Sequence, residues 1–158
     1  MHPIERTKYV IYGVVLLILS PLLLTIAFGR SLLSRSSSQK ILVIPILTRV
    51  GDLVCSTPVF RAIKIQFPSS HLSVAVANKA IGILRYNKRI DNLVNINDKP
   101  FKGWLGRGRF FWYIFSERYD VVISLTNNPL NSLMALASAA PQRIKTTLRG
   151  RSIPERLT

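Results

Sequence analysis

The stretch ILVIPILTRVGDLVCSTPVFRAIKIQFPSSHLSVAV, residues Ile41–Val76, decides the fold of this chain. It begins with four apolar residues, Ile41–Ile44, as expected of a strand buried on both faces. Apolar residues at helical spacing follow over Val50–Phe67, and Pro68 ends the pattern. Leu72–Ala77 is a second short apolar run. The stretch therefore predicts a strand, a helix and a second strand.

The same alternation continues toward the C-terminus. Short apolar runs predict strands at Asn92–Ile96 and Tyr119–Leu125, and helical spacing predicts helices at Lys79–Tyr86 and Pro129–Ala139. Strands that alternate with helices indicate an α/β fold, a Rossmann-like parallel sheet with helices on both faces. Such sheets bind ligands beyond the carboxyl ends of their strands.

One segment, Lys99–Tyr113, admits two interpretations because it interleaves cations with aromatic residues. It could lie in a membrane interface, or it could form a crossover helix packed on the sheet. We expect the aromatic residues after Arg109 to belong to a crossover helix and the first half to be a lipid-facing loop.

The N-terminal part of the chain is the most hydrophobic. Tyr9–Phe28 runs for twenty residues without a charge, and a helix of that length spans about 30 Å, the thickness of a bilayer core. We therefore expect one transmembrane helix; a cleavable signal peptide, with Arg6 and Lys8 as its basic region, is the alternative. The expected organisation is a tail and transmembrane anchor at 1–30, a serine-rich linker at 31–39, and a partial Rossmann-like domain at 40–158.

The charge of the chain is strongly positive, with 22 Lys and Arg against 7 Asp and Glu in 158 residues. Residues 30–158 carry 20 basic and 6 acidic side chains, a net charge of +14 outside the expected span. Four cations follow the span before the first acid, Asp52, which indicates that the domain faces the cytoplasm from the inner membrane. A surface of this charge attracts anionic lipid headgroups or a phosphorylated substrate. We expect no nucleic-acid partner, because an anchor would confine the domain and no nucleic-acid-binding motif is present.

Composition excludes two classes of protein. A chain with 48% hydrophobic residues is too apolar for an intrinsically disordered tail, and a single cysteine, Cys55, permits no internal disulfide. We expect Cys55 to be a small buried residue on the first helix. The two histidines, His2 and His71, have no metal-ligand partner at usable spacing, so we expect no metal site.

The loop after the first strand is where chemistry is expected. It delivers Gly51 and Asp52 to the start of a helix at the ligand-binding edge of the sheet. Gly51 allows close approach of the backbone to a ligand, and the free N–H groups of a helix start favour anions. Asp52 is either catalytic or a cap for those N–H groups. The loop contains neither a dinucleotide-binding G-x-G-x-x-G nor a phosphate-binding G-x-x-x-x-G-K-[ST] motif.

At these residues the sequence resembles glycosyltransferase family 9, the lipopolysaccharide heptosyltransferases. Arg49-Val50-Gly51-Asp52, Thr57-Pro58, Arg61-Ala62 and Phe67-Pro68 fall at the spacings of that family's first loop and helix. Ile90–Val94 and Tyr119–Leu125 resemble its next two strand entries, with Ser124 where the family usually has Asp. The resemblance covers about two-thirds of the chain.

The resemblance implies a GT-B enzyme that transfers a sugar from a nucleotide-sugar donor, such as ADP-heptose, to a lipopolysaccharide-core or related glycolipid acceptor. It places the anionic glycolipid acceptor on this N-terminal half and the donor on a second Rossmann-like domain that is missing here. The chain is then a fragment, a truncated product or one subunit of a split pair, inactive alone. The alternative is an inactive membrane-tethered remnant or adaptor that binds anionic lipid.

The resemblance also assigns roles to residues. Asp52 would be the general base that deprotonates the acceptor hydroxyl, and Arg49, Gly51, Thr57 and Arg61 would bind the acceptor. We expect no cofactor other than the donor.

Overall fold

The fold was determined from a computed structural model, which describes residues 38–45, 50–101, 103–126 and 129–146, together with positions 14, 18, 21, 25, 26, 28 and 29. Five parallel strands form one sheet in the order β3-β2-β1-β4-β5. In chain order the strands are β1 (Lys40–Ile44), β2 (His71–Val76), β3 (Asn92–Asn95), β4 (Val121–Ser124) and β5 (Gln142–Lys145). The expected parallel α/β sheet is confirmed.

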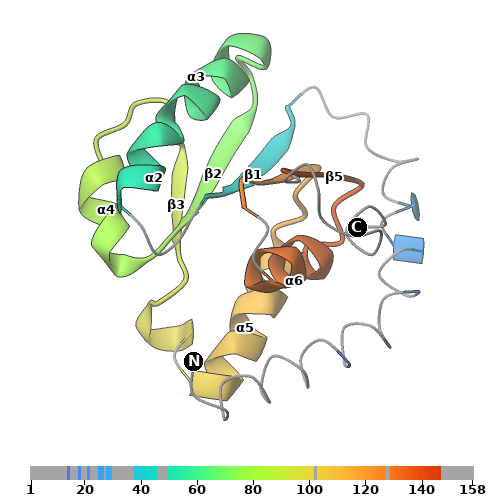
Figure 1. The fold of residues 1–158 in the computed structure, drawn as a ribbon. Coiled ribbons are helices and arrows are strands. Elements are labelled where there is room, and N and C mark those ends of the chain that lie inside the picture. The colour runs from blue at the N-terminus through green and yellow to red at the C-terminus, as the bar shows by residue number, and fades with distance from the viewer. Residues whose placement is uncertain are drawn as a thin grey trace.

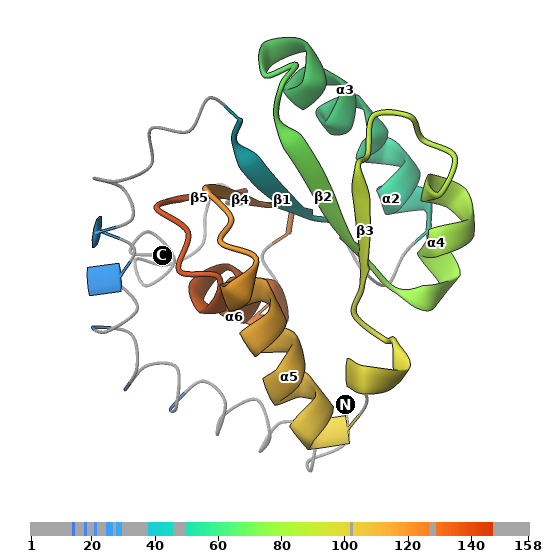
Figure 2. The same cartoon turned by 180° about the vertical axis from the view of Figure 1, so that it is seen from behind.

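Helices cover both faces of the sheet (Figures 1 and 2). One face carries α2 (Val50–Cys55), α3 (Thr57–Gln66) and α4 (Asn78–Leu84). The opposite face carries α5 (Gly103–Ser116) and α6 (Pro129–Ala137), and a short 3-10 helix, η1 (Lys99–Phe101), precedes α5.

The central strand is buried on both sides, as its apolar run predicts. Ile41 and Val43 of β1 pack under α2, α3 and α4, whereas Leu42 and Ile44 pack toward α5 and α6. All four residues are at most 2% exposed. Because successive side chains of a strand point to opposite faces, this one strand contributes to both halves of the core.

The sequence predicts one helix over Val50–Phe67, but the structure has two helices there. The prediction is therefore wrong near the middle of this segment. The chain turns at Ser56 between α2 and α3, and Pro58 stands in the first turn of α3. Proline lacks the N–H that would bond the carbonyl of Val54, and its ring clashes with that carbonyl in a continuous helix. The Val54 carbonyl instead accepts a hydrogen bond from the Thr57 hydroxyl at 2.7 Å.

The interruption also changes which side chains reach the core. Leu53, Phe60 and Ile63 are buried, whereas Val54 is 49% exposed. Cys55, expected to be buried, is exposed because it ends the short helix α2, from which only Leu53 is buried.

The segment Lys99–Tyr113 forms η1 and most of α5, and therefore most of it is helical. Phe110 is 4% exposed and packs under the sheet, so the crossover-helix expectation for the later aromatics is confirmed. Trp112 on the same helix is 70% exposed. The expected loop in the first half is wrong, because α5 already begins at Gly103, whose positive φ of 75° suits a glycine at this turn.

The structure describes few residues of the expected membrane segment. Tyr9–Phe28 lies mostly outside the described residues, as does most of the linker at 31–39. Within the portion that is described, no helix is both long and apolar enough to cross a bilayer.

Two aspartates in equivalent positions join the amino ends of neighbouring strands. Asp91 precedes β3, and its Oδ2 accepts the backbone N–H of Leu72 in β2 at 2.6 Å. Asp120 precedes β4, and its Oδ2 accepts the backbone N–H of Lys40 in β1 at 2.8 Å. In both pairs the aspartate's own N–H donates to the partner's carbonyl at 2.9 Å. Each aspartate thus forms two hydrogen bonds with the backbone of the neighbouring strand, one through its side chain and one through its own N–H, at the edge where the strands begin.

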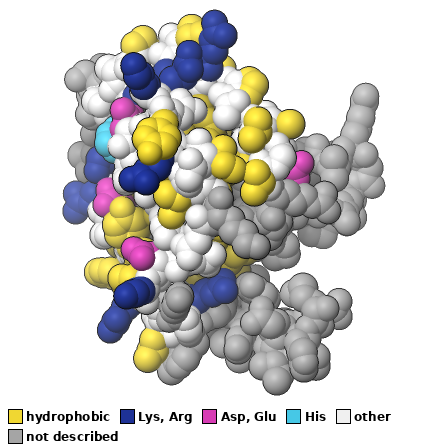
Figure 3. Space-filling model, turned by 90° about the vertical axis from the view of Figure 1, so that its left-hand side faces the viewer, with side chains coloured by type: hydrophobic (Ala, Val, Ile, Leu, Met, Phe, Trp, Pro, Cys, Tyr) yellow, Lys and Arg dark blue, Asp and Glu magenta, His cyan; other side chains and the backbone are white. Residues whose placement is uncertain are grey.

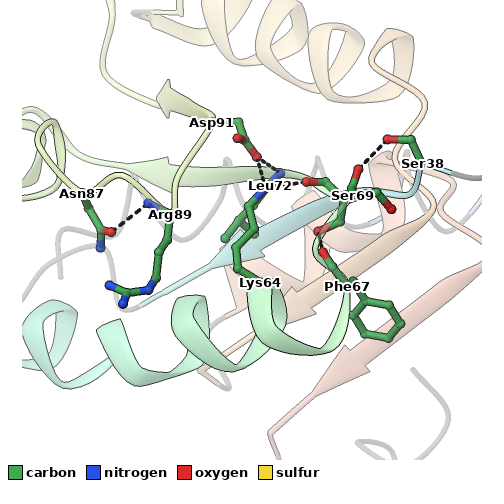
Figure 4. Close-up of polar contacts among 9 residues, drawn as sticks. Ser38, Lys64, Phe67, Ser69, Leu72, Asn87, Arg89 and Asp91 are labelled. Atoms are coloured by element: carbon green, nitrogen blue, oxygen red, sulfur yellow. Dashed lines mark hydrogen bonds and ion pairs between the residues drawn. The ribbon is translucent and has the colours of Figure 1, made fainter.

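Lys64 at the end of α3 ties this edge to the helix layer (Figure 4). Its Nζ lies 2.6 Å from Asp91 Oδ2 and also donates to the carbonyl of Ser70. The turn after α3 is joined in addition to the chain before β1, because the Ser38 hydroxyl donates to the Ser69 carbonyl at 2.8 Å.

Candidate functional site

The candidate site lies at the carboxyl ends of β1 and β4, the two central strands. β3 follows β2 outward on one side of β1, whereas β4 pairs with β1 on its other side, so the order of strands reverses here. The chains that leave β1 and β4 lead to helices on opposite faces, α2 and α6. In doubly wound sheets this arrangement opens the crevice in which ligands bind.

Gly51 and Asp52 lie at this edge, as the sequence predicts, in the first turn of α2. A Cβ built on Gly51 meets no atom within 4 Å, so this backbone is open rather than packed. Asp52 is half-buried, and its backbone carbonyl accepts the Ser56 hydroxyl at 2.8 Å. Arg49, predicted to contact the acceptor, lies outside the described residues.

Thr57 and Arg61 lie on α3 rather than on the helix of Asp52. The Thr57 hydroxyl is engaged with the Val54 carbonyl, and the Arg61 side chain is exposed one turn further along. α3 runs back toward the amino edge of the sheet, because its end connects to the start of β2. The structure therefore keeps Gly51 and Asp52 together and separates Arg61 from them by the turn at Ser56 and one turn of α3.

Asn131 is a residue of this edge that sequence analysis missed. It lies in the first turn of α6, is 1% exposed, and its Nδ2 donates to the Pro45 carbonyl directly after β1 at 3.3 Å. Its Oδ1 accepts no hydrogen bond from any residue that the structure describes. Asn131 therefore holds the start of the loop that leads to Gly51. Its Oδ1 is a hydrogen-bond acceptor beside that loop.

The end of β4 is fixed by local hydrogen bonds. Ser124 is 1% exposed, and its hydroxyl donates to the Thr126 carbonyl at 2.9 Å. The Leu125 N–H donates to the Ile44 carbonyl at 3.0 Å, which continues the β1–β4 pairing one residue past the end of β4. At the position where the resembling family usually carries Asp, this chain thus uses a serine to shape a turn.

A cleft of about 80 Å³ opens on the α5–α6 side of the same edge. Arg107 and Asn97 line it together with apolar and aromatic residues. The remaining lining residues are Ile96, Phe101, Phe110, Leu130 and Met134. A cation, an amide and aromatic walls suit a polar ligand that carries an anionic group. The interleaved cations and aromatic residues of Lys99–Tyr113 are the sequence signal for this cleft. The sequence does not show which of these cations faces the edge of the sheet.

The titratable groups with shifted pKa values have structural explanations. Burial raises the pKa of Tyr119 to about 12, with a hydrogen bond to Ser73 opposing the change. Burial also raises the pKa of Tyr113 on α5, and the negative charge of Glu117 adds to the effect. The described part of the chain contains no group of three or more residues able to hold a metal ion.

Comparison with known proteins supports the resemblance derived from the sequence. No family model matches the chain. Over 80 residues it is 30% identical to lipopolysaccharide heptosyltransferase 3 of Escherichia coli, a match that covers 49% of this chain and 24% of that protein.

Two solved structures share the fold. The glycosyl transferase family 9 protein from Veillonella parvula matches 68% of this chain and 32% of its own length, with a TM-score of 0.60 and 25% identity. The ADP-heptose lipopolysaccharide heptosyltransferase II of E. coli matches 68% of this chain and 30% of its own length, with a TM-score of 0.58 and 22% identity. The chain thus resembles a partial domain of family 9 glycosyltransferases and spans about a third or less of each protein that it matches.

Proposed function

We propose that this chain is the acceptor-binding half of a heptosyltransferase-type glycosyltransferase. The reaction would transfer a sugar from a nucleotide-sugar donor, such as ADP-heptose, to a lipopolysaccharide-core or related glycolipid. The observation that carries the proposal is the position of Gly51 and Asp52 at the carboxyl edge of a parallel sheet whose strand order reverses beside them. The similarity to heptosyltransferases adds to it.

In this proposal Asp52 accepts the proton of the acceptor hydroxyl while that oxygen attacks the anomeric carbon of the donor sugar. The bond from that carbon to the nucleotide diphosphate breaks, and the diphosphate leaves with the electron pair. Arg49, Gly51, Thr57 and Arg61 would bind the acceptor. The cleft with Arg107 and Asn97 offers a second place for its anionic groups.

The donor would be bound by a second domain outside residues 1–158, so these residues by themselves would not complete the transfer. We further propose that Tyr9–Phe28 anchors the chain in the inner membrane with the domain in the cytoplasm, next to a glycolipid acceptor. The supports are the uncharged span and the four cations that follow it before Asp52.

The test replaces Asp52 by Asn in a chain completed with the remaining part of a related heptosyltransferase. Asn keeps the size of the side chain and can still cap a helix, but it cannot accept the proton. If Asp52 is the base, turnover falls by roughly 10²–10⁴-fold while acceptor binding and melting temperature stay unchanged.

The matched control is Asp98→Asn, since Asp98 is an exposed aspartate that follows β3 at the same edge and hydrogen-bonds the Lys99 N–H. This variant is expected to keep normal turnover. Near-normal turnover of Asp52→Asn would remove Asp52 from catalysis and leave it a structural residue of α2.

A further inference from the structure

We propose that the amino edge of the sheet is the surface by which this chain lies against an anionic lipid bilayer. The contact surface, called here the amino-edge patch, consists of Ile65, Phe67, Arg85, Tyr86, Lys88 and Arg89. The inference rests on the proposed membrane attachment and adds which face of the domain meets the lipid.

The patch exposes large apolar side chains where a soluble surface rarely gathers them. Tyr86 is 81% exposed, Ile65 is 67% exposed and Phe67 is 44% exposed. Aromatic residues of this kind are enriched where proteins meet the headgroup region of a membrane. An exposed apolar group with charged neighbours marks an interaction surface.

Three cations lie within three residues of Tyr86 in the turn between α4 and β3. Arg85, Lys88 and Arg89 are all exposed, and the Arg85 guanidinium lies 5.5 Å from the centre of the Tyr86 ring. The carboxylate next to them in sequence, Asp91, is already bound by Lys64. Figure 3, which looks at the left-hand side of Figure 1, shows Lys and Arg side chains gathered at the top of the molecule, with apolar and some acidic side chains below them.

The two turns that form the patch are joined through one side chain. Lys64 contacts the Ser70 carbonyl in the turn after α3 and Asp91 at the end of the turn before β3. Figure 4 shows Phe67 and Arg89 on either side of Lys64. The turn that carries Phe67 and the turn that carries Arg89 are therefore held to each other.

The path of the chain argues for lipid as the occupant. The segment that follows the expected span enters the fold at this edge, where Ser38 bonds Ser69 and the His71 N–H donates to the Gln39 carbonyl at 2.8 Å. The nine residues between Phe28 and Ser38, which make ten steps from Cα to Cα, reach at most about 35 Å. The headgroups would therefore lie within reach of the patch, and cations beside aromatic residues complement anionic headgroups.

The experiment places an environment-sensitive label on the full-length chain in vesicles. In a Cys55→Ser background, a fluorophore is attached to Gln66→Cys beside the patch or to Asn97→Cys at the carboxyl edge. Quenching by lipids with spin-labelled headgroups is measured in phosphatidylcholine with and without phosphatidylglycerol. We expect the label at position 66 to be quenched only with phosphatidylglycerol, and the label at 97 to be unquenched in both lipids.

Two triple variants that lose the same positive charge distinguish an effect of the patch from an effect of the overall net charge. Arg85→Gln/Lys88→Gln/Arg89→Gln is expected to lower the ratio of docked to undocked protein by about a hundredfold, since each cation near an anionic surface contributes about 1 kcal/mol. The matched variant Lys99→Gln/Arg107→Gln/Arg109→Gln is expected to keep the quenching. Equal effects of both variants, or stronger quenching at 97 than at 66, would overturn the proposal.

Flotation distinguishes failure of the patch from failure of the anchor. A chain that floats with phosphatidylcholine vesicles is held by its span, and absence of quenching at 66 with phosphatidylglycerol then refutes the patch alone. A chain that floats only with phosphatidylglycerol, and not as the patch variant, supports the patch and refutes the anchor. A chain that floats with neither lipid refutes both, whereas transferase activity is judged separately by Asp52→Asn.

Discussion

At the scale of single residues, the Asp91 carboxylate is held by two hydrogen bonds, from Lys64 Nζ and from the Leu72 N–H. Burial raises the pKa of its carboxyl group, but the hydrogen bonds from Lys64 and Leu72 and the charges of Lys64 and His71 outweigh burial and lower the pKa below its ordinary value of 3.8. A carboxyl group with a lowered native pKa stabilises the fold while it is ionised. Asp91→Asn is therefore expected to cost about 1 kcal/mol at pH 7, at the low end for charged hydrogen bonds because the group is partly solvated.

The pH dependence of that cost identifies its origin. The contribution of Asp91 is complete above the unfolded-state pKa and is lost as the pH falls through the lowered native pKa. Melting temperatures of the wild type and Asp91→Asn should thus differ at pH 7 and converge well below pH 3.8. Asp98→Asn, at an exposed position, serves as the control. A difference that persists undiminished in acid would show that lost packing, not charge, is responsible.

A residue of the candidate site can be predicted from the sequence when its position depends only on residues close to it in the chain. Gly51 and Asp52 follow directly from a strand, a loop and a helix start that are adjacent in sequence. Asn131 could not be found in this way, because its partner Pro45 lies 86 residues earlier and the two meet only when β1 and β4 pair. A single asparagine within the apolar run Pro129–Ala137 was the available signal.

At the scale of elements, two of the three glycines of α5, Gly106 and Gly108, have opposite surroundings. A Cβ on Gly106 would lie 2.4 Å from the backbone carbonyl carbon of Phe101 in η1, whereas a Cβ on Gly108 meets no atom within 4 Å. Gly106→Ala is expected to lower the free energy of unfolding by about 1–3 kcal/mol, since backbone atoms must move. Gly108→Ala is expected to raise it by about 0.5–1 kcal/mol through helix propensity.

Denaturant unfolding of the two variants checks the packing of α5 on η1. Each alanine adds the same methyl group to the same helix, so each serves as the control for the other. Stabilisation by both substitutions would mean that η1 does not lie against Gly106.

The elements that the sequence predicts best are those whose side chains are all buried, so that the apolar pattern is unbroken. β1 is apolar over Ile41–Ile44 because both of its faces are covered, and its prediction is confirmed. β5 was missed because Gln142–Lys145 contains a single apolar residue, Ile144, which is 54% exposed at the edge of the sheet. The continuous helix over Val50–Phe67 failed because one backbone feature, the ring of Pro58, outweighs a regular apolar spacing.

At the scale of the whole molecule, the proposed topology can be tested in cells. Alkaline phosphatase, which is active only in the periplasm, is fused to Thr158, and we expect no activity because the four cations after the span keep the domain in the cytoplasm. A green fluorescent protein fusion at the same residue is expected to fluoresce. Strong phosphatase activity would reverse the orientation.

The isolated chain is expected to bind acceptor without turning it over. Purified residues 1–158 should transfer no sugar from ADP-heptose, because the proposed donor-binding domain lies outside them. Its binding to an anionic glycolipid should weaken as salt is raised, since exposed charges are screened within about 10 Å at 0.1 M ionic strength. Detectable transfer by the chain alone, checked by mass spectrometry of the acceptor, would contradict the division into two halves.

The paired aspartates at the amino edge have a consequence for how the chain avoids misfolding. Asp91 and Asp120 each match one amide of one earlier strand. A slip of one residue would bring the carboxylate toward a carbonyl oxygen instead of an N–H, because these groups alternate along a strand. A shifted pairing of β3 with β2, or of β4 with β1, would therefore lose this hydrogen bond and bring two oxygen atoms close together. The two aspartates therefore favour the observed register of the β2–β3 and β1–β4 pairs from the first residues that pair.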